Sequence, residues 1–562
     1  MATDPAIISV DDLTVGFNMR QGMFDVLHGI TFDLHRGQTT AIVGESGSGK
    51  SVTARAILNM VPRPGVINGG RILFRPAVGE ETDLTALDPR GKSIRAIRGG
   101  RIGMIFQEPM SSLSPVHTIG GQIIEAIRLH RDVSRKEAKD LACEVLEQVE
   151  IPKPTVALEQ YPFEFSGGMR QRAMIAMALS CHPDVLIADE PTTALDVTTQ
   201  AEILDLMRKL QSDLGMAIMF ITHDMGVVAE IADDVVVMEK GYVVERGETR
   251  ALFAHQTHPY TRKLLGAVKR LDRPADIKIR PEPEAPDILR VDDLRLYFHK
   301  RQGFLQRITD TTKAVDGVSF NLKQGEALGI VGESGSGKTT VGRCIARVYD
   351  PTSGAIQYDG TDLVAAQRAE LKAYRQQIRM IFQDPFASLN PRMTVKQIVA
   401  EPLIVNKLAR GSELEDRVAT LLRQVGLDAG MMERYPHAFS GGQRQRIVVA
   451  RAIALEPKLV IADEPTSALD VSIRTQVLDL LLTLQADLGL SFIFISHDMA
   501  VIRYFCDRVA VMFRGRIVEI GETEQVITDP QHPYTKALLS SVPISDPALR
   551  GTRQRHRYRE DA

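Results

Sequence analysis

Two short segments carry residue types that could bind a phosphate group. Gly44–Ser51 (GESGSGKS) and Gly332–Thr339 (GESGSGKT) both fit the pattern GxxxxGK[ST]. Glycines in such a loop permit positive φ, so that successive backbone N–H groups can surround a β-phosphate. The lysine would add a positive charge at the β and γ oxygens, and the final hydroxyl would bind Mg²⁺. The nucleotide contacts expected here are Gly44, Ser46, Gly47, Ser48, Gly49, Lys50, Ser51, Gly332, Ser334, Gly335, Ser336, Gly337, Lys338, Thr339 and Thr340.

Acidic residues follow two apolar runs further along the chain. Asp189 and Asp463 come directly after Val185–Ala188 and Leu459–Ala462. Strand ends at one edge of an α/β sheet are where ligands bind, so each aspartate is expected to orient the metal or its water.

The next residue in each copy, Glu190 or Glu464, suits a general base for the attacking water. The alternative, a solvated loop carboxylate, is disfavoured by the apolar run before each pair and the Pro-Thr after it. Gln107 and Gln383 are candidates for contact with the metal or water, and His223 and His497 for contact with a γ-phosphate.

These residues belong to a duplicated chain. Ser166 and Ser440, Asp189 and Asp463, and His223 and His497 are each 274 residues apart. Upstream the offset grows to 288 at Gly44 and Gly332, so only the earlier loops differ in length. This pattern predicts two domains, not a solenoid of short repeats. The expected ranges are a first domain at 1–270, a proline-rich linker at 271–286, a second domain at 287–545 and a basic tail at 546–562.

Apolar runs alternate with helical patterns within each copy. The runs at 40–43, 185–188, 217–222, 459–462 and 491–496 predict buried strands. Residues 195–214 show helical spacing, and 121–160 and 395–435 predict helical blocks. Strands that alternate with helices indicate an α/β fold with a parallel sheet.

Composition excludes several classes of protein. The 562 residues are 44% hydrophobic and 25% charged, which is globular composition, and Lys+Arg 68 against Asp+Glu 71 argues against a general nucleic-acid binder. The four cysteines form no CxxC pair. No apolar run is long enough to span a bilayer, and the first residues lack the profile of a signal peptide. We therefore expect a cytoplasmic protein whose membrane role would depend on a partner.

The order of motifs resembles the ATP-binding subunits of ABC transporters. Each copy holds the phosphate loop, an FQ glutamine, an SGG signature, a DE pair, an ALD segment and an HD histidine. The HPYT segments at His258–Thr261 and His532–Thr535 resemble the peptide and nickel import branch. The resemblance implies two tandem ABC-type ATPase domains, each with a doubly wound parallel sheet, an antiparallel β subdomain and a helical subdomain.

The same resemblance implies further contacts to ATP. It pairs the loop at 44–51 with the signature at Ser440–Gln443, and the loop at 332–339 with Ser166–Met169. Met169 departs from the glutamine that is usual there. Tyr297 competes with Phe298 for the adenine-stacking role in the second half, and a core phenylalanine is the alternative for Phe17 and Phe298. The residues implied are Phe17, Ser166, Gly167, Gly168, Asp196, Phe298, Ser440, Gly441, Gly442, Gln443 and Asp470.

The family further implies ATP and Mg²⁺ as cofactors, two competent sites and an importer of oligopeptides, dipeptides or glutathione-like substrates. The expected partners are two transmembrane permease subunits and an extracytoplasmic solute-binding protein, with the chain peripheral at the cytoplasmic face of the bacterial inner membrane. Because no cysteine cluster follows either HPYT segment, no iron–sulfur cluster is expected.

Alternative functions stay open from sequence alone. A twin ATPase acting on ribosomes or DNA is disfavoured by the short proline-rich linker and the net charge of −3, and a fused sugar importer by the HPYT segments. The HPYT segments are expected to have a local structural role, and the arginine-rich tail to be solvated.

Overall fold

The computed structural model describes residues 5–20, 22–107, 112–193, 195–276, 282, 284–302, 307–467, 469–552 and 555–558. The chain divides into two compact units. The first holds residues 1–195, 199–268 and 543–553, and the second holds 196–198, 269–542 and 554–562. The linker expected at 271–286 lies partly outside the described residues, at 277–281 and 283.

A six-stranded sheet forms the centre of the first unit, in the order β10-β9-β3-β8-β7-β6. All neighbours from β9 to β6 are parallel, and only β10 pairs antiparallel, with β9. The predicted parallel sheet is therefore confirmed. Its strands are β3 (Thr39–Val43), β6 (Ile102–Ile105), β7 (Val185–Asp189), β8 (Ala217–Thr222), β9 (Asp234–Glu239) and β10 (Tyr242–Glu248).

Apolar side chains cover both faces of this sheet, which explains the continuous apolar runs in the sequence. Leu186 and Ala188 of β7 face one hydrophobic core, which includes residues of the helical block. Val185 and Ile187 face the other core, which includes the antiparallel strands. Every residue of β7 is buried, so the strand holds Asp189 at a defined place on the sheet edge.

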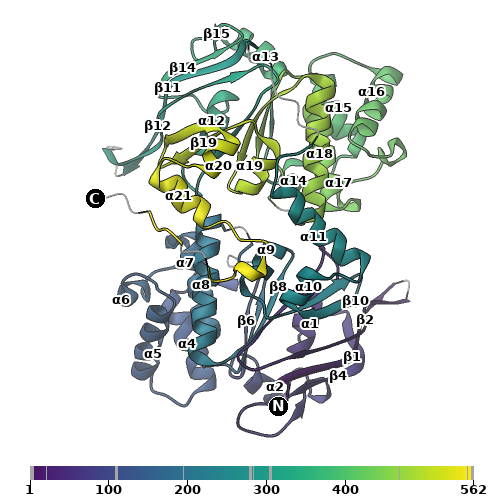
Figure 1. The fold of residues 1–562 in the computed structure, drawn as a ribbon, viewed down its shortest axis with the longest axis vertical. Coiled ribbons are helices and arrows are strands. Elements are labelled where there is room, and N and C mark those ends of the chain that lie inside the picture. Colours follow the sequence, from purple (N-terminus) through teal and green to yellow (C-terminus); the bar gives the residue numbers. More distant parts are fainter. Residues whose placement is uncertain are drawn as a thin grey trace. The chain divides into compact units, whose positions relative to one another are not determined.

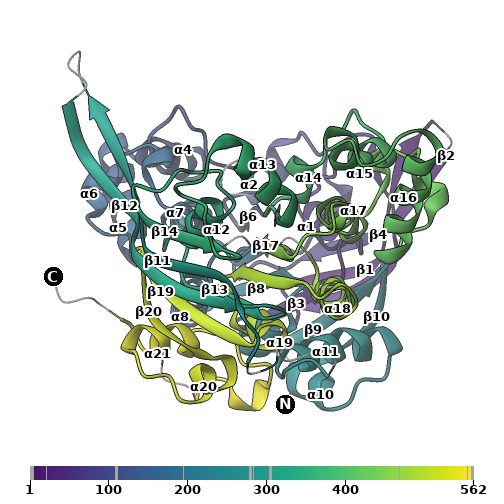
Figure 2. The same ribbon diagram turned by 90° about the horizontal axis from the view of Figure 1, so that it is seen from above.

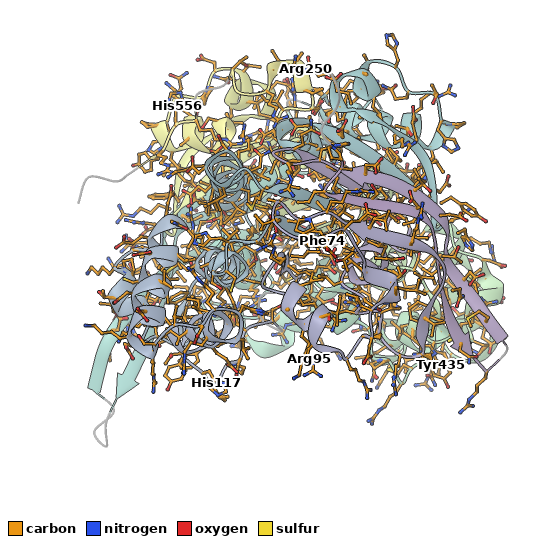
Figure 3. All side chains as sticks on the ribbon, turned by 90° about the horizontal axis from the view of Figure 1, so that it is seen from below. Phe74, Arg95, His117, Arg250, Tyr435 and His556 are labelled. Atoms are coloured by element: carbon orange, nitrogen blue, oxygen red, sulfur yellow. The ribbon has the colours of Figure 1, made fainter. Side chains whose placement is uncertain are left out.

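An antiparallel sheet in the order β2-β1-β4-β5 lies on one side of the central sheet of this unit, and the helical block lies on the other (Figure 1). Phe74, at the end of β4, is buried, with only 2% of its surface exposed. His117, just before the helical block, projects outward from the surface (Figure 3). The strands are β1 (Ile8–Met19), β2 (Gly22–Leu34), β4 (Gly65–Phe74) and β5 (Thr82–Asp83).

Helices fill the predicted helical block and separate the parallel strands. Short helical turns occupy 84–86 and 162–164. The helices of the first half are α1 (Lys50–Ile57), α2 (Lys92–Ile97), α4 (Ile119–His130), α5 (Arg135–Gln148), α6 (Pro154–Ala157), α7 (Gly167–Leu179), α8 (Val197–Leu214), α9 (Met225–Ile231), α10 (Thr249–Ala254) and α11 (Pro259–Leu271).

The second unit repeats this plan, with the sheets β16-β17-β18-β13-β19-β20 and β12-β11-β14-β15 (Figure 2). Its strands are β11 (Asp287–Gln302), β12 (Arg307–Lys323), β13 (Ala327–Val331), β14 (Ser353–Tyr358), β15 (Thr361–Asp362), β16 (Ile378–Ile381), β17 (Leu459–Asp463), β18 (Ser491–Ser496), β19 (Arg508–Phe513) and β20 (Arg516–Glu522). Its helices are α12 (Lys338–Ile345), α13 (Arg368–Gln377), α14 (Pro385–Ser388), α15 (Val395–Val405), α16 (Gly411–Gln424), α17 (Gly441–Ile453), α18 (Val471–Leu488), α19 (Met499–Phe505), α20 (Thr523–Thr528) and α21 (Pro533–Ser540).

Part of the basic tail is ordered, in contrast to the solvated end that the sequence suggests. Within the first unit, the Arg550 guanidinium donates to the carbonyls of Ile231 and Ala232, each at 3.0 Å, and pairs with Asp233 at 2.9 Å. The cation therefore satisfies carbonyls at the C-terminus of α9, where a positive charge is favourable. Arg553 and Arg559 lie outside the described residues.

Across the described residues, none of the helices combines the length and the low polarity that a membrane-spanning helix requires.

The helices that follow the two SGG motifs begin with different caps. Ser440 accepts the Gln443 N–H at 3.3 Å, and the Gln443 side chain accepts the Ser440 N–H at 3.0 Å, which completes a capping box. Ser166 accepts the Met169 N–H at 3.3 Å, but the Met169 thioether packs against the core of the first unit instead of returning a bond. The departure at Met169 therefore removes half of the cap.

We predict that Gln443→Met lowers the free energy of unfolding by about 0.5–1 kcal/mol, because the Ser440 N–H loses its acceptor. The midpoint of urea unfolding measures this change. Gln443→Glu keeps an acceptor at the same place and should behave like the parent. Equal midpoints for the methionine variant and the parent would show that the returned bond contributes nothing.

Candidate nucleotide sites

Each phosphate-binding loop connects a buried strand to a helix, β3 to α1 and β13 to α12. Gly47 and Gly49 have φ of 83° and 100°, and Gly335 and Gly337 have φ of 80° and 102°. No atom lies within 4 Å of a Cβ built on Gly47 or Gly335, so both turns face open space. The backbone at Gly47 and Gly335 is therefore open to a ligand, as an anion site requires.

A buried lysine lies at the centre of each loop. Lys50 is 5% exposed and donates to the carbonyls of Gly44 at 2.7 Å and Glu45 at 2.9 Å. Lys338 makes the same bonds to Gly332 and Glu333, both at 2.7 Å. Burial lowers the pKa of Lys338, and nearby carboxylates partly oppose this shift.

Paired oxygens next to each lysine fit a magnesium ion. The Ser51 hydroxyl donates to Asp189 at 3.0 Å, and the Thr339 hydroxyl donates to Asp463 at 2.8 Å. Burial raises the pKa of both aspartates, because a carboxylate charge is unfavourable away from water. A bound cation would stabilise that charge. Mg²⁺ prefers oxygen ligands and is held by few carboxylates together with phosphates, so this donor set fits it.

Glu190 lies beyond the end of β7 with a φ of 48°, a conformation that L-residues rarely adopt. Its N–H donates to the Ile221 carbonyl of β8 at 3.0 Å, which fixes the turn. Glu464 repeats this geometry, with a φ of 46° and a 2.9 Å bond to Ile495. The unusual conformation at the same place in both copies directs the glutamate away from the strand axis, as a functional site can require.

Three side chains surround the Glu190 carboxylate. Gln107 and Thr193 each donate to Oε2 at 2.9 Å, and His223 Nδ1 lies 3.3 Å from Oε1. The structure therefore brings the glutamine and histidine candidates to the glutamate. Thr193 is not predicted from the sequence, although a hydroxyl at the same offset, Ser467, was available as a signal.

The second copy forms the same cluster. Gln383 donates to Glu464 Oε2 at 2.9 Å, and His497 Nδ1 lies 3.1 Å from Oε1. The Ser467 hydroxyl donates to the Glu464 backbone carbonyl at 3.2 Å instead of to the carboxylate.

Electrostatics keep these glutamates ionised. Burial by itself would raise the pKa of Glu190, but the bond and charge of His223, the Thr193 hydroxyl and Lys50 lower it to about 2. The pKa of Glu464 is lowered against burial by His497, Lys338 and Gln383. Each glutamate therefore presents a carboxylate that can orient a water molecule at neutral pH.

Sheet order explains how residues distant in sequence meet. β8 lies between β3 and β7, and β6 pairs with the other side of β7. Because these strands are parallel, the loop after β3, Asp189 at the end of β7, His223 after β8 and Gln107 after β6 all lie at one edge.

The signature glycines differ in their surroundings. A Cβ on Gly168 would lie 2.6 Å from Thr199, and one on Gly442 would lie 2.4 Å from Ile473, so α7 and α17 approach their neighbouring helices closely. Gly167 and Gly441 have nothing nearer than 4.0 Å and 3.6 Å. Ser166 and Ser440 are exposed N-caps of these helices.

The aromatic candidates for adenine lie on the first strand of each antiparallel sheet. Phe17 is half-buried on β1. Phe298 is 45% exposed on β11 and contacts Tyr349 edge to face, with ring centroids 5.8 Å apart. Tyr297 donates its hydroxyl to Asp316 at 2.5 Å, which engages it elsewhere. This difference favours Phe298 over Tyr297 as the stacking residue.

The remaining candidates lie on loops and helix starts. Thr340 is half-buried in α12, and Asp470 precedes α18 as its N-cap. Asp196 belongs to the second unit, where its carboxylate lies 3.4 Å from the Ser334 N–H.

Comparisons with known proteins agree with this arrangement. The ABC transporter family matches residues 27–193 and 315–467. The family described as "Oligopeptide/dipeptide transporter, C-terminal region" matches residues 244–293 and 518–561.

Two curated relatives are named glutathione import ATP-binding protein GsiA. The protein from Pectobacterium atrosepticum is 48% identical, over 99% of this chain and 92% of its own length. The protein from Escherichia coli K12 is 49% identical, over 96% of this chain and 90% of its own length. A solved structure of cbiO1 from Clostridium perfringens, part of the ABC transporter complex cbiONQ, is 30% identical over 43% of this chain and 91% of that chain, with a TM-score of 0.38. The chain therefore belongs to the ABC transporter family, as a tandem ATPase whose halves each carry the oligopeptide/dipeptide transporter C-terminal region.

Proposed function

We propose that this chain hydrolyses ATP at two competent sites to energise the import of short peptides or glutathione-like substrates. The observation that carries the proposal is that both halves form the same polar contacts at the buried lysine, the hydroxyl–aspartate pair and the glutamate–histidine pair. The relatives named for glutathione import and the transporter C-terminal regions support the substrate class.

The side chains have distinct roles in this proposal. Lys50 and Lys338 hold the β and γ phosphate oxygens, while the backbone N–H groups of the loops bind the β-phosphate. Ser51 with Asp189, and Thr339 with Asp463, hold Mg²⁺, which neutralises phosphate charge when bound. Glu190 and Glu464 orient the attacking water and accept its proton, and His223 and His497 position the glutamates and face the γ-phosphate.

We predict that Glu190→Gln and Glu464→Gln each lower the ATPase rate about 100-fold or more, because each removes a proton acceptor without changing the side-chain volume and the two sites are proposed to turn over together. Steady-state phosphate release at saturating Mg-ATP measures the rate. Glu81→Gln, at a carboxylate that pairs with Arg75 outside the sites, is the matched control and should keep the parental rate. A parental rate in either glutamate variant would mean that the substituted site does not contribute to ATP hydrolysis.

We further propose that the two signature motifs contribute hydrogen-bond donors to nucleotide binding. Exposed serine hydroxyls and helix N-termini can donate to a γ-phosphate, and both signatures offer these groups.

We predict that Ser166→Arg and Ser440→Arg each reduce photolabelling of the chain by 8-azido-ATP about twofold or more, because the long cation blocks a γ-phosphate position. Mass spectrometry of the labelled peptides measures the labelling. Labelling at the parental level in both variants would contradict a role of the signature motifs in nucleotide binding.

The proposed partners are two membrane permeases and an extracytoplasmic binding protein, with the chain at the cytoplasmic face of the inner membrane. The family membership and the importer relatives support this assembly. Substrate choice belongs to those partners, so adjacent reading frames are the source of the proteins to test.

We predict that the chain, co-expressed with such permeases and a binding protein, supports ATP-dependent uptake of radiolabelled glutathione or a short peptide. Substitution of Glu190 and Glu464 by glutamine should lower uptake at least tenfold while the complex still co-purifies. Salt-sensitive association with nucleic acid and no association with permeases would instead favour a soluble twin ATPase.

A further inference from the structure

The HPYT segments begin the last long helix of each half, and their first residues shape the helix start. His258 Nδ1 accepts the Tyr260 N–H at 3.3 Å, and His532 Nδ1 accepts the Tyr534 N–H at 3.1 Å. The prolines between them are the first residues of α11 and α21, where a missing N–H costs nothing.

A glutamate on the edge strand ties the turn before each helix to the central sheet. Glu245 of β10 accepts the N–H groups of Thr257 at 2.7 Å and His258 at 3.1 Å. Glu519 of β20 accepts those of Gln531 at 2.8 Å and His532 at 3.0 Å. Burial opposes ionisation of both glutamates, but these bonds lower the pKa of each below its ordinary value. The bonds to Glu245 and Glu519 therefore hold the tyrosine of each HPYT segment in a defined place.

The tyrosine hydroxyls contact the phosphate-binding loops directly. The Glu45 N–H donates to the Tyr260 hydroxyl oxygen at 2.8 Å, and the Glu333 N–H donates to that of Tyr534 at 3.0 Å. Both tyrosines are buried, at 6% and 1% exposure. A structural role confined to the C-terminal segment does not account for this contact.

Each tyrosine shares one peptide unit with the buried lysine. In the peptide between Gly44 and Glu45, the carbonyl accepts from Lys50 at 2.7 Å and the N–H donates to Tyr260. In the peptide between Gly332 and Glu333, the carbonyl accepts from Lys338 at 2.7 Å and the N–H donates to Tyr534. The orientation of this peptide plane is therefore fixed from both sides. Because the lysine ammonium donates to the peptide carbonyl, the peptide in turn fixes the direction of the lysine side chain.

We propose that Tyr260 and Tyr534 are positioning residues for nucleotide binding, through which the HPYT segments hold the first turn of each phosphate loop. The tyrosines act through the peptide and the lysine and do not touch the nucleotide. Without the hydroxyl, the peptide can rotate and the loop must be ordered when the nucleotide binds, which costs affinity. The inference rests on nucleotide binding at the two loops, as proposed above.

The experiment removes only the hydroxyls, by Tyr260→Phe and Tyr534→Phe, singly and together in the full chain. We expect the Kd for MANT-ATP with Mg²⁺, measured in the Glu190→Gln/Glu464→Gln background, to rise about fivefold in the double variant, as for the loss of one hydrogen bond. In the hydrolysing chain, KM for ATP should rise by a similar factor while kcat at saturating ATP stays within twofold.

Tyr242→Phe is the matched control, because it removes an exposed hydroxyl from β10, where the ring stacks on His28 at 4.5 Å. This variant should keep the parental Kd. A double tyrosine variant with an unchanged Kd overturns the inference, whether or not its unfolding midpoint falls. Failure of the parent chain to bind MANT-ATP would instead contradict the proposed nucleotide sites.

Discussion

A buried ammonium group in each phosphate-binding loop sets the main constraint on this structure. A charge removed from water is costly unless it is hydrogen-bonded, and Lys50 and Lys338 each receive two loop carbonyls for this purpose. The loops that supply these carbonyls contain glycines in left-handed conformations, which other residues rarely adopt. At Gly47 and Gly335 the turn faces open space, so the loop that surrounds the lysine also leaves room for a ligand beside it.

The order of the parallel strands determines which residues meet at each glutamate cluster. Four parallel strands end at one edge, and each contributes one group: the loop, the aspartate–glutamate pair, the histidine and the glutamine. Strain at Glu190 and Glu464, both at positive φ, directs the carboxylates toward the histidine and the glutamine. The two copies reproduce these contacts to within a few tenths of an ångström, although the hydroxyls of Thr193 and Ser467 bond to different oxygens.

The C-terminal segments show that a region with no recognisable chemistry of its own can belong to a site. Tyr260 is 215 residues from Glu45, and Tyr534 is 201 residues from Glu333. No local pattern connects them, because a tyrosine at the start of an amphipathic helix is ordinary for a core position. The edge-strand glutamates that fix these helices likewise leave no recognisable pattern in the sequence, because their partners are backbone N–H groups.

The amino-acid sequence predicts the duplication, the parallel α/β sheets, the buried strands and the residue types gathered around each phosphate loop. It could do so because apolar runs, glycine spacing and repeated offsets are local patterns that follow from backbone geometry. The domain ranges and the roles of the site residues remain predictions. Tertiary structure alone decided the tyrosine contact with the loop, the hydroxyl on Glu190 and the docking of Arg550 at the end of α9. Those contacts join a side chain to a distant backbone or side-chain group, and only the folded chain specifies which groups meet.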